Sequence, residues 1–152
     1  MVMLSSSLEK YLIGIYEMLE EDKELKISDL AKRMNQPLQK VIQALQRMHY
    51  QKHIVYSTYQ PLRMTEQGRK TAEYLIARNA LIDEFFGILR IEKNADLEKE
   101  AMVQYLSRES LEKIERFVLF NRKYPEISER FNLLLQMVPQ DRLLPPIPND
   151  EH

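Results

Sequence analysis

The chain has 152 residues, of which 44% are hydrophobic and 30% charged, with three glycines and no cysteine. These values are typical of a helix-rich globular protein of one domain, or of two small ones that share a core, and they exclude disulfides and thiolate metal sites. The sequence has no apolar run of about 18 residues and its first residues do not resemble a secretory signal. We therefore expect a cytoplasmic protein without a membrane segment.

The net charge of −1 conceals a basic block at residues 31–70. These forty residues contain eight lysines and arginines and one acidic residue, which gives a net charge of +7. A basic block in an otherwise acidic chain is typical of a protein that binds a polyanion such as DNA. A solvated surface that keeps the protein soluble would give the same count, so charge alone leaves both interpretations open.

Apolar residues at helical spacing predict a first helix over 8–20, with Ser7 as its N-cap. A short second helix is predicted over 27–34, and a third is predicted to begin at Pro37, because the first position of a helix tolerates a residue without an N–H group. Two short helices joined by a tight turn predict a helix-turn-helix. The third helix places apolar residues on one side and polar ones on the other, and the polar group comprises Gln39, Lys40, Gln43 and Arg47.

A β-hairpin follows the helix-turn-helix. Residues 53–57 alternate and are rich in β-forming residues, and 62–64 can return as a second strand after a turn. Thr65 then caps a long helix that extends to about residue 89, and the rest of the chain reads as three shorter helices and a proline-rich tail. The predicted elements of that region are helices at about 96–106, 109–122 and 126–138 and an extended or disordered tail over 141–152.

The fold class is therefore mainly α, with a winged helix-turn-helix DNA-binding domain over 1–71 and an all-helical domain over 72–140. The amides of the third helix can make paired hydrogen bonds to adenine, and its cations can reach a guanine edge or a phosphate. Cations in the wing and at the start of the long helix would lie near the phosphate backbone. The candidate DNA-binding residues are Gln39, Lys40, Gln43, Arg47, Arg63 and Lys70. The alternative is a winged-helix scaffold that binds protein and not DNA.

Enzyme activity is not expected. His49 and His53 lie at the end of the third helix and the start of the wing without a partner constellation for catalysis. The sequence also has no phosphate-cradling glycine loop and no nucleophile elbow.

Six segments, in this order and spacing, resemble the diphtheria-toxin-repressor family of metal-dependent bacterial regulators. The resemblance covers about residues 7–138 and is closest to the shorter branch typified by the manganese transport regulator, which lacks an SH3-like domain. It implies a transcription regulator, with repression as the expected mode, that binds a palindromic operator in double-stranded DNA as a homodimer, with the helices after the long one as the dimerisation domain. The segments are SLEKYLIGIYEMLEE, ISDLAKRM, VIQALQRM, MTEQGRK, ARNALIDEFF and EAMVQYLS.

The family binds a divalent metal between the first helix, the long helix and the helix that contains EAMVQYLS. Only Glu100 keeps an ideal ligand type among the corresponding positions, and a lysine ammonium would repel a dication. We therefore expect lost or altered metal control, no confidently assigned cofactor, and an unknown effector. By the resemblance the metal-ligand positions fall on Lys10, Ile13, Asn79, Glu100, Val103 and Gln104.

Two interpretations of this region stay open. A weak oxygen-rich site for Mn²⁺ or Fe²⁺ could be built from Asn79, Asp83, Asp96 and Glu100, because the two aspartates lie at or near accessory ligand positions of the longer branch. The regulator would then respond to metal through non-standard ligands. Alternatively, Lys10 pairs with Glu100 or Asp83, and this salt bridge replaces the ion.

Overall fold

The computed structural model describes residues 4–21 and 24–148, and within them the chain forms seven helices and one small antiparallel sheet. The mainly helical fold class predicted from the sequence is confirmed, and the hairpin pairs Ile54 with Met64 and Val55 with Arg63. In chain order the elements are α1 (Ser6–Glu21), α2 (Ile27–Met34), α3 (Leu38–Tyr50), β1 (Ile54–Val55), β2 (Arg63–Met64), α4 (Glu66–Leu89), α5 (Ala95–Tyr105), α6 (Arg108–Lys123) and α7 (Pro125–Leu135).

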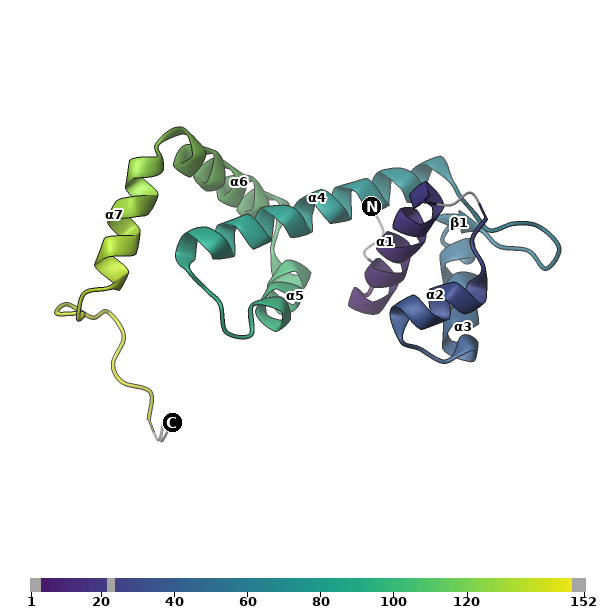
Figure 1. Ribbon diagram of the computed structural model, residues 1–152, viewed down its shortest axis with the longest axis horizontal. Helices are drawn as coiled ribbons and strands as arrows, with labels where there is room; N and C mark the ends of the chain where they lie inside the picture. Colours follow the sequence, from purple (N-terminus) through teal and green to yellow (C-terminus); the bar gives the residue numbers. More distant parts are fainter. Residues whose placement is uncertain (1–3, 22–23, 149–152) are drawn as a thin grey trace.

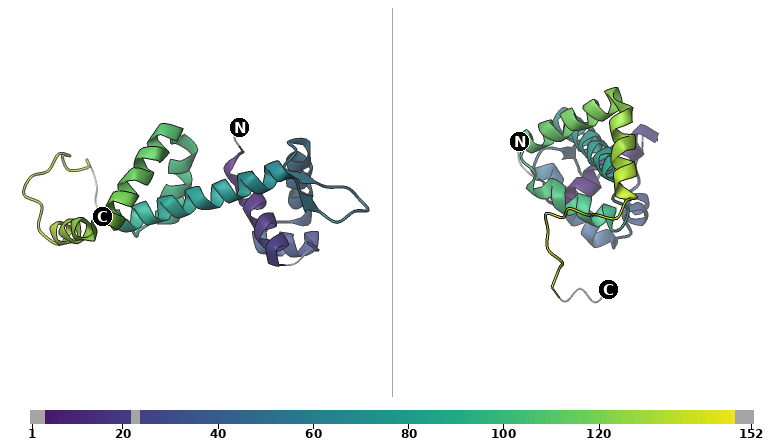
Figure 2. Two further views of the ribbon diagram at one scale, coloured as in Figure 1. Left: turned by 90° about the horizontal axis from the view of Figure 1, so that it is seen from above. Right: turned by 90° about the vertical axis from the view of Figure 1, so that its left-hand side faces the viewer.

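The long helix α4 forms the axis of the molecule (Figure 1). Helices α1–α3 and the hairpin surround one end of α4, and α5 and α6 lie along its other end, with α7 beyond them (Figures 1 and 2). The predicted division at 71/72 falls inside this continuous helix. Ala72 and Leu75 pack into the core of the first end, whereas Ile82 and Phe86 belong to a second cluster. A single rigid element therefore carries side chains of both cores.

Short capping contacts determine where the helices begin. Ser5 Oγ accepts a hydrogen bond from the Leu8 amide at 3.3 Å, and α1 begins at Ser6. Ser7 was the predicted cap, and this was wrong, because Ser7 lies inside the first helical turn. Thr65 Oγ1 accepts from the Gly68 amide at 3.0 Å, which confirms the predicted cap of α4.

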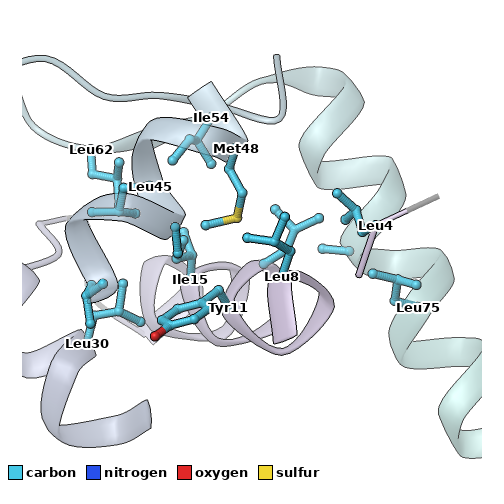
Figure 3. Close-up of a cluster of buried hydrophobic side chains, with 14 residues drawn as sticks. Leu4, Leu8, Tyr11, Ile15, Leu30, Leu45, Met48, Ile54, Leu62 and Leu75 are labelled. Carbon is cyan, nitrogen blue, oxygen red and sulfur yellow. The ribbon is translucent and has the colours of Figure 1, made fainter. Parts of the chain in front are cut away.

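The core of the first end holds the helix-turn-helix rigidly (Figure 3). Burying a leucine or isoleucine side chain stabilises a fold by about 1.5–3 kcal/mol, so this cluster fixes which side of α3 faces inward. Its opposite side is consequently presented to solvent. The members with no exposed surface are Leu12, Ile15, Leu30, Val41, Leu45, Met48 and Ala72.

The C-terminal end is much less buried than the rest. Helix α7 has no buried residue and ends at Leu135, three residues before the predicted end. Residues 139–148 form no helix or strand, as expected for the tail, and 149–152 lie outside the described residues. Among the helices that the structure describes, none is long and apolar enough to cross a membrane.

Candidate DNA interface and control site

The outer side of α3 presents the four polar residues predicted from the sequence. Gln39, Lys40, Gln43 and Arg47 are all exposed. Within the residues that the structure describes, none of these side chains has a hydrogen-bond or ion-pair partner. Two amides and two cations on one exposed helical surface can therefore meet base edges and phosphates without first breaking a contact in the protein.

The two remaining candidates differ in their surroundings. Arg63 lies on β2 and is exposed. Lys70 is also exposed, but its Nζ lies 3.8 Å from Glu66 Oε1, so an acid partly neutralises it. Glu66 is held mainly by Arg69, whose hydrogen bonds lower the pKa of that carboxyl. Among the described residues Arg63 has no acidic partner, so it is the less neutralised of these two cations.

Hydrogen bonds donated by backbone amides fasten the wing to α3 and α4. The Tyr56 amide donates to His49 Nδ1 at 3.1 Å, and the Thr65 amide donates to the His53 carbonyl at 3.1 Å. A Cβ at Gly68 would lie 1.8 Å from that same His53 carbonyl oxygen, so α4 can approach this closely only with glycine at the position. These contacts give both histidines structural roles that sequence reasoning did not assign.

Among the metal-ligand positions inferred from the resemblance, Lys10 on α1 contacts Glu100 on α5. Lys10 Nζ lies 3.0 Å from Glu100 Oε2, and the Ser6 hydroxyl donates to Glu100 Oε1 at 2.6 Å. The Ser6 hydrogen bond first, and then Lys10, lower the pKa of Glu100. Lys10 and Glu100 also border the groove that runs beside Lys40, Gln43 and Arg47. The ion pair therefore lies next to the proposed DNA-reading surface.

The other candidate ligands also face cations of the chain. Lys99 Nζ lies 2.5 Å from Asp83 Oδ1 and 3.7 Å from Asp96 Oδ1, which connects α5 to α4. Asn79 Oδ1 accepts a hydrogen bond from Arg78 Nη2 at 3.1 Å. Asp83 is thus occupied by Lys99, and of the two acids considered for Lys10, Glu100 is the one in contact.

The residues at the family's metal positions do not fit a divalent ion. Ile13 packs against the first core and Val103 is buried in the second, so neither supplies a donor. The ammonium of Lys10 beside the single ideal ligand would repel a dication. Within residues 4–21 and 24–148, no group of three or more acids and histidines is close enough to hold a metal. The structure does not bring Asn79, Asp83, Asp96 and Glu100 together as such a group.

Sequence reasoning missed a further ion pair between α1 and α4. Glu9 Oε2 lies 2.7 Å from Arg78 Nη2, and the two side chains are only 12% and 9% exposed. The partners are 69 positions apart, so no local pattern could reveal them. The helices α1, α4 and α5 are therefore joined pairwise by three ion pairs, one between each pair of helices.

Comparison with known protein families assigns both parts of the chain. Residues 3–62 match the N-terminal DNA-binding domain of the iron-dependent repressors, and residues 65–132 match their metal-binding and dimerisation domain. The chain belongs to the iron-dependent repressor family. The resemblance identified from the sequence is confirmed, and this repressor-family protein is a DNA-binding transcription regulator. Transcription regulation is not an enzyme class.

Two curated relatives cover most of this iron-dependent repressor family member. It is 27% identical over 113 residues to the HTH-type transcriptional regulator MntR of Geobacillus kaustophilus (strain HTA426), which covers 74% of the chain and 80% of the relative. It is 26% identical over 129 residues to the HTH-type transcriptional regulator MntR of Bacillus pumilus (strain SAFR-032), which covers 84% of the chain and 88% of the relative. The similarity therefore extends over both the DNA-binding and the helical regions.

Proposed function

We propose that the protein is a homodimeric repressor that binds a palindromic operator and no longer depends on a divalent metal. The observation that carries the loss of metal control is the Lys10 ammonium, 3.0 Å from Glu100 Oε2. A cation supplied by the chain occupies the position where a bound cation would otherwise be attracted to the carboxylate. Duplex DNA remains the polyanion that the +7 block at residues 31–70 is suited to bind.

The DNA-binding half of the proposal is supported by the exposed side of α3, whose polar side chains have no partner among the residues that the structure describes. Helix-turn-helix dimers place two recognition helices in successive major grooves, about 34–36 Å apart, so a palindromic operator matches a two-fold symmetric protein. Lys40 and Arg47 would contribute affinity, and Gln39 and Gln43 would contribute base readout. The match to a dimerisation domain at residues 65–132 supports the homodimer.

The loss of metal control is supported by the contacts among α1, α4 and α5. Glu9 with Arg78 joins α1 to α4, Lys10 with Glu100 joins α1 to α5, and Asp83 with Lys99 joins α4 to α5. Two of these contacts tie a helix of the DNA-binding end to the helical end. Because they form within the chain, they would hold the DNA-reading helices in one orientation without an ion.

The test is operator binding by chelator-treated protein, measured by fluorescence anisotropy on the promoter region of its own gene. We expect Mn²⁺, Fe²⁺ and Zn²⁺ to change the Kd for the operator by less than about twofold. A metal can favour the DNA-binding conformation only if it binds that conformation more tightly than the other, and the proposed protein has no such metal site. A tenfold or larger gain with metal would favour a metal-responsive repressor that uses non-standard ligands. Failure to bind any DNA at low salt would favour the protein-binding scaffold.

A matched pair of variants tests the contact itself. Glu100→Gln removes the acid that Lys10 and Ser6 engage, whereas Glu98→Gln removes an exposed acid of the same helix. The Lys10 and Glu100 side chains are 58% and 39% exposed, so the ion pair is of modest strength. We expect Glu100→Gln to weaken operator binding by about two- to fivefold and Glu98→Gln to leave it unchanged.

A further inference from the structure

Most of the large apolar side chains that remain exposed lie at the C-terminal end. Of eighteen such side chains among the described residues, twelve lie between Phe117 and Ile147. Eight of the twelve follow residue 132, where the match to the family's dimerisation domain ends. A soluble protein rarely leaves a large contiguous apolar patch in water unless a partner covers it. The eight are Leu133, Leu134, Leu135, Met137, Val138, Leu143, Leu144 and Ile147.

Helix α7 itself indicates a missing contact surface. None of its eleven residues is buried, and it lies to the side of the bundle of α4, α5 and α6, where the Ser128 hydroxyl donates a hydrogen bond to Asn121 Oδ1 of α6 at 2.7 Å (Figure 1). An isolated helix shorter than about 12–15 residues is marginal in water, and most helices in proteins are stabilised by packing of an apolar side. The exposed apolar side chains of α7 are therefore available to a further packing surface.

The tail that follows α7 does not supply that surface for its own copy. Leu143 is fully exposed, Leu144 is 80% exposed and Ile147 is 71% exposed. In Figure 1 the tail runs below α7, apart from α5 and α6. These side chains therefore do not pack on the helices of the same chain, and a second copy offers the same uncovered α6–α7 surface in return.

The prolines of the tail suit a segment that binds an apolar surface in an extended conformation. Pro139, Pro145, Pro146 and Pro148 have no N–H group, so a tail pressed against apolar side chains leaves few donors without a partner. Proline also restricts the unbound chain, which reduces the entropy lost on ordering. Asp141 and Arg142, the charged residues of 139–148, precede the apolar run from Leu143 to Ile147.

We propose that residues 133–147 extend the dimer interface beyond the family's dimerisation domain, with the tail of each copy packed across α6 and α7 of the other. The inference rests on the proposed homodimer. A two-fold axis makes such an exchange reciprocal, because each copy gives a tail and receives one. Each dimer would then bury six large tail side chains, three from each copy.

The first test compares the dimer dissociation constant of three full-length proteins by analytical ultracentrifugation over a concentration series. We expect the triple variant Leu143→Ser/Leu144→Ser/Ile147→Ser to raise the dissociation constant by at least about tenfold, because six apolar side chains no longer leave water on association. The matched control, Gln140→Ser/Asp141→Ser/Arg142→Ser, changes three polar tail residues and should dimerise as the wild type does.

The second test locates the tail. A photo-crosslinking amino acid at position 144, in a dimer mixed from ¹⁴N- and ¹⁵N-labelled chains, should give intermolecular crosslinks to residues 117–135. A triple variant that dimerises as tightly as the wild type, or crosslinks confined to one chain, would overturn the tail exchange and leave the homodimer intact. A wild-type chain that stays monomeric at every concentration would overturn the homodimer as well.

Discussion

Glu9 on α1 and Arg78 on α4 form an ion pair that is almost sealed from water, with 2.7 Å between Glu9 Oε2 and Arg78 Nη2. Removing one partner of such a pair leaves a buried charge without compensation. We predict that Arg78→Met lowers the free energy of unfolding by about 3 kcal/mol or more. Urea denaturation at a fixed protein concentration measures the change, since the stability of a dimer depends on concentration.

Two further variants distinguish the effect of breaking this buried ion pair from the effect of losing an arginine side chain. The double variant Glu9→Leu/Arg78→Met should regain much of the lost stability, because apolar replacement of both buried partners is often close to neutral. Arg108→Met breaks an exposed pair with Glu112, where the side chains are 92% and 60% exposed. Its effect should stay within about 0.5 kcal/mol. An Arg78→Met variant no less stable than Arg108→Met would contradict the prediction.

The two glycines of α4 at positions 68 and 87 should respond in opposite directions to alanine. At Gly68 the added Cβ would lie 1.8 Å from the His53 carbonyl oxygen, a backbone atom that cannot move away cheaply. We predict that Gly68→Ala lowers the free energy of unfolding by about 3 kcal/mol or more. At Gly87 an added Cβ would meet nothing within 4 Å apart from the adjoining residues and backbone of its own helix, so Gly87→Ala should raise the free energy of unfolding by about 0.5–1 kcal/mol. Equal melting temperatures for the two variants would refute this account of the α3–α4 corner.

Burial of His53 predicts a loss of stability in mild acid. Burial lowers the pKa of His53, whereas the unfolded chain titrates near about 6.5. Below that pH the unfolded state takes up a proton that the folded state resists, so the free energy of unfolding falls as the pH drops from about 7 and levels off below the folded-state pKa. His53→Leu should remove this part of the pH dependence, as measured by urea denaturation between pH 7 and 5. The same slope in both proteins would show that His53 is not responsible.

Local patterns in the sequence predicted the helices well because a helical period and a cap depend on neighbouring residues. Thr65 was identified as a cap from its position before an apolar stripe, and its hydroxyl does accept from the Gly68 amide. Ser5, Ser6 and Ser7 are chemically the same, so the sequence could not indicate which hydroxyl faces the first turn. The structure selects Ser5, since the chain at Ser6 is already helical.

Contacts between distant helices were less accessible. The resemblance indicated that Lys10 lies near Glu100 and Asp83, but the sequence could not decide between the two acids. In the structure Lys99 of α5 pairs with Asp83 of α4, and Lys10 pairs with Glu100. Glu9 and Arg78 lie in two of the segments that carry the resemblance, but nothing in either segment indicated that they pair, because their contact depends on how α1 crosses α4.

The role of Lys40 in DNA binding can be measured from the salt dependence of operator affinity. Lys40 is exposed on α3 and, within the part of the chain that the structure describes, has no ion-pair partner. Each phosphate that a protein cation neutralises adds about 0.9 to the slope of log K against log salt concentration. We predict that Lys40→Ala weakens binding to all DNA sequences and lowers the slope by about one unit for each recognition helix on the DNA. Lys113→Ala removes an exposed lysine from α6 and should leave the slope unchanged. If both variants gave the wild-type slope, the outer side of α3 would not be the surface that faces the phosphates.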